Sequence, residues 1–345
     1  MSSGFMPLFS HQQLRTLLQQ HLLRVNTPAD IAQKVADNLV EASLKGHDSH
    51  GVTLLPRYIR AILAGDLKPD ARLHTVRDAG AVLSFDGGHG FGQLLGEQAM
   101  QAGIDRVQQF GVALVGLSNS HHLGRIGAWA EQVAAAGLVS IHFANVAAPS
   151  AVLPFDGLRA RLGTNPFCVG IPLADRPPVV LDFATSAIAG NKARVAWNEG
   201  RPIPPGCAVD ANGEPTTDPG VLMSEPRGAL LPFGGHKGAG LSLICSLLGA
   251  ALTGGETESH DIAPRAGIIN NMLSILFDPK KLGAGESYQQ EVLAQVDWVR
   301  HDQQGRDVQI PGEPEQRAWA RRIEEGIAID EVSWQEFVAL ESLTA

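Results

Sequence analysis

The stretch DGGHGFGQLLGEQAM, from Asp86 to Met100, decides which fold the chain can have. It is rich in glycine and lies between a strand-like run, Ala81–Asp86, and a helical run, Gln93–Phe110, which is where a Rossmann fold places its dinucleotide-binding turn. The glycines fall at positions 87, 88, 90, 92 and 96, and no choice among them gives GxGxxG. No acidic residue ends the next strand convincingly either. We therefore predict a tight βα turn and no Rossmann site.

The rest of the chain divides into helical ends and a β/α middle. Ser10 is a typical cap for a first helix, and a second helix is expected to begin at Thr27 as its cap, with Pro28 as the first helical residue and Gly46 as the stop. Apolar runs then predict further strands and helices. The strands are Val112–Leu117, Leu138–Val146, Pro177–Phe183 and 270–279, and the helices are Ile126–Ala136 and one or more over Pro314–Leu343.

Two segments have unusual composition. Pro202–Pro226 is rich in Pro, Gly and Asp, which predicts a long ordered loop or lid. His236–Thr253 is apolar on nearly all sides, so we expect a buried helix that stops at Gly254.

The bulk composition narrows the class of protein. The chain has 345 residues, of which 44% are apolar, and this length favours two or three lobes. A net charge of -9 argues against binding a nucleic-acid backbone as the main function. The three cysteines form no CxxC pair, and no secretory or membrane-spanning segment is recognisable. We expect a cytoplasmic protein that does not bind membranes.

Standard catalytic motifs are missing. The sequence has no GxxxxGK[ST], HExxH or GxSxG. His121 and His122, with His47, Asp48 and His50, contain enough donors for a metal, but neighbouring side chains point in different directions, so we predict no metal site. A metal-dependent hydrolase or lyase is kept as an alternative class.

Polar clusters follow apolar elements at five places along the chain. A His at the mouth of a shared pocket titrates near neutrality and can exchange a proton with a substrate oxygen. Five such clusters favour one composite pocket over five unrelated loops. They are GHDSHG (46–51), SNSHHLGRIG (118–127), LGTNP (162–166), LDFATS (181–186) and FGGHKGAG (233–240).

These clusters resemble a known family. The segments GHDSHGV, NSHHLGRIG, LGTNPF, DFATSAIA, LLPFGGHKG and IPGEPE, in this order over nearly the whole chain, are similar to the signature segments of the second malate/L-lactate dehydrogenase family. That family binds nicotinamide cofactors without a Rossmann fold. The resemblance implies an α/β (α+β) fold with a mostly antiparallel sheet in the cofactor-binding domain, and a helical domain built from both chain ends.

The resemblance also implies domain boundaries and an assembly. Residues 1–70 and 312–345 would form the helical domain, and 71–120, joined by part of 275–311, an α/β domain. Residues 121–274 would form the cofactor-binding domain. Members are typically homodimers with the active site between domains.

The same resemblance assigns site residues. His50 matches the proton donor to the oxygen on C2 of a 2-oxo acid, and Ser49 and Asp48 are candidates for orienting its ring; His47 has no matching role. NAD or NADP would be the cofactor. The cofactor contacts carried over are His50, Gly124, Arg125, Ile126, Val180, Leu181, Asp182, Phe183, Ala184, His236, Asn270, Gly312, Glu313, Pro314 and Glu315.

On the substrate side the chain departs from the family. His122, Thr164 and Asn165 are expected to line the pocket. Many members carry an Arg four residues after the proton donor, where this chain has Leu54, with Arg57 three residues further on. Leu54 suggests an apolar wall and a bulkier 2-oxo acid, and the substrate carboxylate would need another cation. The candidates are Arg125, Arg161 and Lys192.

The implied activity is an NAD(P)-dependent 2-hydroxyacid dehydrogenase acting on small 2-oxo and 2-hydroxy acids such as 2-oxoglutarate, phenylpyruvate or hydroxyphenylpyruvate. Two alternatives besides the metal enzyme remain. One is reduction of a cyclic imine acid, pyrroline- or piperideine-2-carboxylate, and the other is a ligand binder without catalysis.

Overall fold

A seven-stranded sheet forms the centre of the computed structural model, which describes residues 7–259, 262, 265–283, 285, 287–301, 305–306 and 308–343. The strand order is β2-β3-β4-β11-β5-β6-β7, and only the pair β3 and β4 is parallel. The predicted mixed fold with a mostly antiparallel sheet is therefore confirmed. The strands are β2 (His74–Ala79), β3 (Val82–Asp86), β4 (Val112–His121), β5 (Val139–Ala147), β6 (Phe167–Leu173), β7 (Arg176–Phe183) and β11 (Ile269–Phe277).

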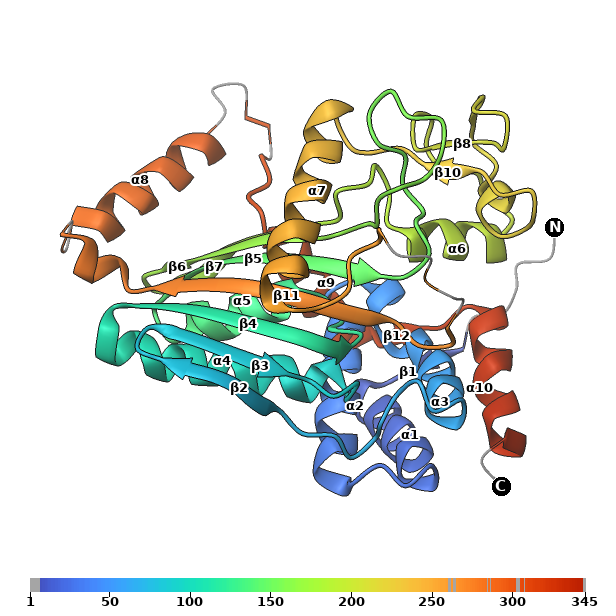
Figure 1. Ribbon diagram of the computed structural model, residues 1–345, viewed down its shortest axis with the longest axis horizontal. Coiled ribbons are helices and arrows are strands. Elements are labelled where there is room, and N and C mark those ends of the chain that lie inside the picture. Colours follow the sequence, from blue (N-terminus) through green and yellow to red (C-terminus); the bar gives the residue numbers. More distant parts are fainter. Residues whose placement is uncertain are drawn as a thin grey trace.

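Helices cover both faces of this sheet (Figure 1). The helices α4 (Gly92–Phe110) and α5 (Gly127–Ala135) lie on one face, and α7 (His236–Gly249) lies on the other. The tight turn predicted after β3 is present, with Gly90 N–H donating to the Gly87 carbonyl at 2.8 Å. At Gly92 a Cβ atom would lie 2.4 Å from the His122 carbonyl oxygen. Glycine is therefore needed at position 92, where the start of α4 packs against the backbone of His122.

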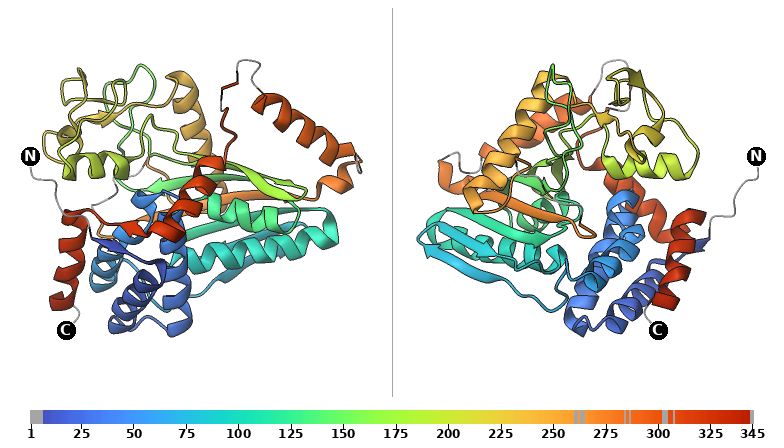
Figure 2. Two further views of the ribbon diagram at one scale, coloured as in Figure 1. Left: turned by 180° about the vertical axis from the view of Figure 1, so that it is seen from behind. Right: turned by 45° about the vertical axis from the view of Figure 1, so that its right-hand side comes forward.

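Helices from both chain ends pack around a second core, seen at the lower right of the second panel of Figure 2. Its buried side chains include Leu14, Ile31, Tyr58 and Phe337. The domain boundaries stay predictions, and strands from 71–120 and from 121–274 lie in the one sheet. The elements of this region are β1 (Leu8–Phe9), α1 (His11–Arg24), α2 (Ala29–Leu44), α3 (Leu55–Leu63), α9 (Glu313–Glu325), β12 (Ile327–Ala328) and α10 (Glu331–Leu343).

The helix ends test the capping predictions. Ser10 caps α1, since its Oγ accepts from the Gln13 backbone N–H at 3.2 Å. The cap predicted at Thr27 is wrong: the capping position of α2 is Pro28, without a side-chain hydrogen bond, and the Thr27 hydroxyl is buried with no partner among the described residues. The helix begins one residue later than the sequence suggested. Gly46 has φ +81° and ends α2 as predicted.

The prediction that α7 is buried on nearly all sides is wrong. Its apolar residues Leu243, Ile244 and Leu247 are 49%, 42% and 47% exposed. Only one side of α7 rests on the sheet, where Gly249 allows an approach in which a Cβ atom would lie 2.7 Å from the Phe143 carbonyl oxygen. The other side has no covering element within the described part of the chain.

The remaining elements lie around α7 and at the edge of the sheet. The predicted loop at 202–226 contains the short strands β8 (Ala208–Val209) and β9 (Pro215–Thr216), which pair in a three-stranded sheet with β10 (Ala229–Leu230). The helix α6 (Gly190–Asn198) precedes it. The helix α8 (Ser287–Arg300) lies at the β6–β7 edge of the main sheet, where Asp297 pairs with Arg176 of β7 at 2.7 Å (Figure 1). In the described residues, no helix has the length and apolar character needed to cross a membrane.

Candidate active site

The cluster around His50 is held in a tight connection between α2 and α3. Two short 3-10 turns, Asp48–His50 and Val52–Leu54, make this connection. At Gly51 a Cβ atom would lie 2.0 Å from the Ser43 hydroxyl oxygen, and that hydroxyl accepts from the Val52 backbone N–H at 3.1 Å. Glycine is therefore required for the turn to close on α2, and this closure fixes His50.

The imidazole of His50 has two neighbours that define its state. Ser49 Oγ lies 2.9 Å from His50 Nδ1, and the ring stacks on His122 with 5.6 Å between centroids. Burial, followed by the nearby charges of His47, Lys192 and Arg125, lowers the pKa of His50 to about 4. The ring is therefore uncharged at neutral pH, with one ring nitrogen that carries no hydrogen.

His122 is held by two residues that the sequence did not single out. Tyr58 Oη lies 2.7 Å from His122 Nδ1, and Gln93 Nε2 donates to Tyr58 Oη at 3.0 Å. Burial, followed by His50 and His121, lowers the pKa of His122 well below its usual value. No local sequence signal marks Tyr58 or Gln93, which lie in the segments PRYIR and FGQLLG.

The neighbouring His121 faces another way. Its Nε2 accepts from the Ile268 backbone N–H at 3.2 Å, and burial lowers its pKa to about 3. The two adjacent imidazoles thus serve different partners, as the strand alternation suggested. Within the described residues, no group of three or more His, Cys, Asp or Glu side chains is arranged to hold a metal ion.

Asp48 and His47 contact the C-terminal helix α9. Asp48 forms two hydrogen bonds with Arg322, at 2.5 and 2.9 Å, and His47 Nε2 lies 2.9 Å from Glu315 Oε1. Of the two residues predicted to orient the His50 ring, only Ser49 contacts it. Asp48 instead ties the connection between α2 and α3 to α9 through Arg322.

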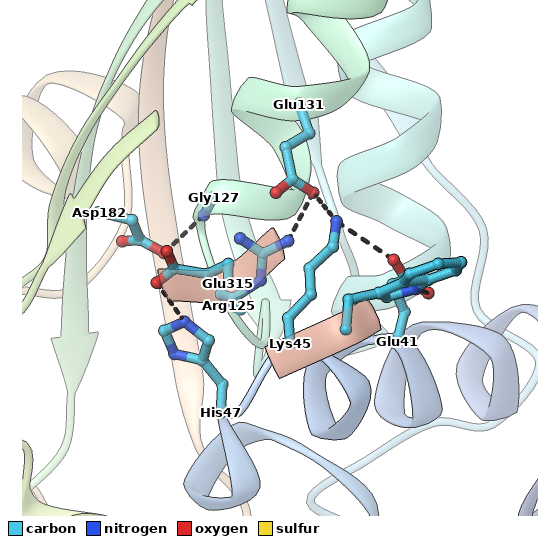
Figure 3. Close-up of polar contacts among 9 residues, drawn as sticks. Glu41, Lys45, His47, Arg125, Gly127, Glu131, Asp182 and Glu315 are labelled. Carbon is cyan, nitrogen blue, oxygen red and sulfur yellow. Dashed lines mark hydrogen bonds and ion pairs between the residues drawn. The ribbon is translucent and has the colours of Figure 1, made fainter. Parts of the chain in front are cut away.

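A charged cluster lies beside this site (Figure 3). Glu131 Oε2 accepts from Arg125 Nη2 at 2.5 Å and from Lys45 Nζ at 2.6 Å, and Lys45 also pairs with Glu41 at 3.1 Å. Burial opposes ionisation, but Arg125 and Lys45 hold the pKa of Glu131 below its usual value. Because Arg125 is only 3% exposed and already paired, it is poorly placed to bind a substrate carboxylate.

Asp182 occupies the start of α5. Its Oδ2 accepts from the Gly127 backbone N–H at 2.7 Å, and burial raises its pKa while Arg125 opposes this. The N–H groups of residues 128 and 129 donate to the carbonyls of Arg125 and Ile126. A pyrophosphate group placed at this helix end would have to displace Asp182.

Other residues predicted to contact the cofactor gather at a cavity of 390 Å³. Val180, Gly312 and Glu315 line it together with Lys45 and Glu131. Gly312 has φ +99°, and a Cβ atom there would lie 3.2 Å from the Pro178 carbonyl oxygen. A ligand in this cavity could therefore come close to the backbone at Gly312, and it would meet charged side chains of both signs.

The remaining predicted cofactor residues lie elsewhere. Asn270 is buried, accepting from the Leu123 backbone N–H at 2.9 Å. Glu313 pairs with Arg300, and Leu181 is exposed. His236 is exposed at the start of α7 and its ring lies 5.7 Å from that of Phe155. Gly124 (φ +69°), Phe183, Ala184 and Pro314 have no polar side chain, so they could contact a cofactor only through the backbone or through apolar atoms.

The residues predicted for the substrate are dispersed. Leu54 is fully buried in the core of the terminal helices, and Asn165 is fully buried with its amide donating to the Ser242 carbonyl at 3.1 Å. The Thr164 carbonyl accepts from the Thr185 N–H. Of the candidate cations, Arg161 lies in a cavity of 890 Å³ beside α7, whereas Lys192 lines a cavity of 260 Å³ with Asp48 and Ser49.

The fold and the histidine site point to one class of enzyme, and sequence comparison agrees. The profile of the family described as malate/L-lactate dehydrogenase matches residues 9–338, so the chain belongs to this family. It is 45% identical over 334 residues to hydroxycarboxylate dehydrogenase B of Escherichia coli (strain K12), covering 95% of this chain and 91% of that protein.

Two solved structures are similar over nearly their whole length. One, from E. coli and assigned as a malate/lactate dehydrogenase, has a TM-score of 0.93 at 43% identity, covering 98% of this chain and 96% of the other. The other is Δ1-piperideine-2-carboxylate reductase from Pseudomonas syringae, with a TM-score of 0.86 at 32% identity, covering 97% and 99%. The chain is an oxidoreductase acting on the CH–OH group of hydroxy acids, and its family implies a nicotinamide cofactor.

Proposed function

We propose that the protein is an NAD(P)-dependent 2-hydroxyacid dehydrogenase that works as a 2-oxo acid reductase, with His50 as the group that exchanges a proton with the substrate oxygen. The observation that carries this proposal is the stacked pair of uncharged imidazoles, His50 and His122, at the junction between the terminal helices and the sheet. A nicotinamide cofactor, when bound, supplies or accepts the hydride at C2 of the substrate.

The protein contributes proton exchange and positioning. Ser49 holds Nδ1 of His50, which leaves Nε2 for the substrate oxygen. In the oxidative direction the neutral ring takes the hydroxyl proton, and in the reductive direction it must first acquire a proton and then donates it. The residues at the 390 Å³ cavity, Val180, Gly312 and Glu315, are proposed to contact the cofactor.

Uncompensated cations near the histidines support an acidic substrate. Lys192 lies close enough to His50 to lower its pKa, and Arg57 lowers the pKa of His122. Arg57 donates through Nε to the Ala266 carbonyl at 3.3 Å, and Arg194 Nε is buried with no partner in the described part of the chain. Among the described residues, no carboxylate pairs with Lys192, Arg57 or Arg194. The extra cations favour a diacid, so 2-oxoglutarate is preferred among the proposed substrates.

A substrate panel tests the proposal. Purified protein is mixed with NADH or NADPH and each of 2-oxoglutarate, phenylpyruvate, hydroxyphenylpyruvate, pyruvate and oxaloacetate, and the nicotinamide absorbance is followed. We expect turnover with at least one acid and the highest kcat/KM with 2-oxoglutarate. No loss of absorbance with any pair would contradict the proposal. The same panel separates NAD from NADP preference.

A second candidate is reduction of a cyclic imine acid. It is supported by the similarity to Δ1-piperideine-2-carboxylate reductase. Pyrroline- and piperideine-2-carboxylate in the same assay discriminate, because a kcat/KM above that of every 2-oxo acid would favour the imine.

A cytoplasmic homodimer is also proposed. On α7 the apolar side chains of Leu243, Ile244 and Leu247 are exposed, which favours a second copy of the chain covering this face in solution. Light scattering after size-exclusion chromatography should give twice the chain mass, and Leu247→Glu should reduce it. A monomer at micromolar concentration would count against the dimer.

A further inference from the structure

The contacts of Tyr58 determine which nitrogen of His122 carries hydrogen. The Tyr58 hydroxyl has two partners, Gln93 Nε2 at 3.0 Å and His122 Nδ1 at 2.7 Å. The hydroxyl lies in the interior, and Tyr58 and Gln93 are both buried. Burial raises the pKa of Tyr58, so the phenol keeps its proton at neutral pH.

The Tyr58 hydroxyl carries a single hydrogen, so it can donate to only one of these two partners. An amide nitrogen only donates, so Gln93 occupies an acceptor position on the phenol oxygen. If His122 also donated from Nδ1, the Tyr58 O–H would be left buried with no acceptor, which is unfavourable. The phenol therefore donates to Nδ1, and a neutral His122 carries its own hydrogen on Nε2.

This tautomer separates the roles of the two stacked rings. His122 stays uncharged, because burial and His50 lower its pKa well below its usual value. A neutral imidazole with Nε2–H is a hydrogen-bond donor and does not compete for the proton that His50 exchanges. Two imidazolium ions with centroids 5.6 Å apart would repel each other.

We propose that Tyr58 and Gln93 are positioning residues that hold His122 in its Nε2–H form, so that His122 donates a hydrogen bond to the substrate oxygen while His50 exchanges the proton. This inference rests on the proposed 2-oxo acid reductase function. The bond to the oxygen strengthens as negative charge builds on it during reduction, so its loss should appear in kcat.

Tyr58→Phe tests the inference with the smallest change of shape, because it removes only the hydroxyl. We expect kcat for the preferred 2-oxo acid to fall about 10- to 100-fold, the range seen when a supporting partner is removed. KM should change less than threefold and NADH affinity should stay the same. Tyr288→Phe alters the other tyrosine of the chain, on α8, and should leave all three values unchanged.

Gln93→Glu reverses the hydrogen bond. A carboxylate accepts from the Tyr58 hydroxyl, so Nδ1 of His122 would become the donor and Nε2 would lose its hydrogen. Nitrogen-15 NMR of histidine-labelled protein reads the tautomer directly, with the His122 signals assigned by their loss in His122→Gln. We expect Nε2–H in the wild type and Nδ1–H in Gln93→Glu, with a lower kcat.

The measurements separate this inference from the proposed function. A wild-type His122 with hydrogen on Nδ1, or a folded Tyr58→Phe protein with kcat within twofold of wild type, would overturn the inference. If Tyr58→Phe does not fold, the wild-type NMR spectrum still decides the tautomer. A protein with Nε2–H at His122 that reduces no 2-oxo acid would overturn the proposed function and the substrate hydrogen bond, but the role of Tyr58 and Gln93 in fixing the tautomer would stand.

Discussion

Two buried polar regions lie side by side in this protein and are built in opposite ways. In the charged cluster of Figure 3, Arg125, Lys45 and Glu131 pair with one another, so its charges are satisfied internally. In the histidine site, His50 and His122 are uncharged and stacked. The first arrangement holds elements together, and the second leaves hydrogen-bonding capacity for a ligand. Closeness of polar groups therefore does not by itself mark a ligand-binding region.

The histidine site and its surroundings are expected to differ most in their effect on kcat/KM. His50→Gln should lower kcat/KM by about 10²–10⁴-fold, the usual contribution of a proton-transfer group, while NADH binding is kept. His47→Gln, three residues away and paired with Glu315, should stay within about threefold. Steady-state kinetics give kcat/KM for the two variants, and titration with NADH gives their cofactor affinity. Equal losses in the two variants would remove the distinction between the regions.

Removing Glu131 should have the largest effect on stability. Glu131→Gln leaves Arg125 buried without its counter-charge, and breaking such a pair costs about 3–5 kcal/mol in the free energy of unfolding. Glu97→Gln, which breaks the exposed pair with Lys34, should cost about 0–1 kcal/mol. Urea unfolding compares the two. A loss below about 1 kcal/mol for Glu131→Gln would mean that the charged cluster does not hold the elements together.

Lowering the pH should reduce the free energy of unfolding, because buried neutral histidines take up protons when the chain unfolds. His121 and His142 are fully buried, and burial lowers the pKa of each to about 3. In the unfolded chain they titrate near about 6.5, so protons favour unfolding as the pH falls below that value. Between pH 7 and 5.5 each should cost about 1 kcal/mol. Thermal unfolding across this range measures the loss, and His142→Gln should reduce its slope.

The smallest effect is expected at Asp48. Because Asp48 bonds Arg322 and is partly exposed, Asp48→Asn should cost less than about 1 kcal/mol of stability and change kcat less than about threefold. The comparison is made by measuring kcat for Asp48→Asn and for Ser49→Ala, since Ser49 contacts the His50 ring. A 100-fold fall in kcat for Asp48→Asn would restore the role in orienting His50 that the sequence predicted.

Most strands of the sheet were predictable because their signals are local, whereas β2 and β6 were not predicted. Apolar runs gave β4, β5, β7 and β11 to within a few residues, and the glycine spacing after β3 correctly excluded a Rossmann turn. The error at Thr27 is also local, since Thr27 and Pro28 are both reasonable starts for α2. The apolar composition of α7 did not reveal that one side is exposed, because composition does not show what covers a helix.

The sequence by itself determined the class of fold and the family, and it made His50 the candidate for proton exchange, since each of these depends on residue types at short spacing. Only the tertiary structure decided that Asp48 pairs with Arg322, 274 residues away, and that Tyr58 and Gln93, 35 residues apart, meet at His122. Hydrogen bonds need partners within about 3 Å. Which distant residues come that close is set by the packing of helices and strands, and no local pattern records it.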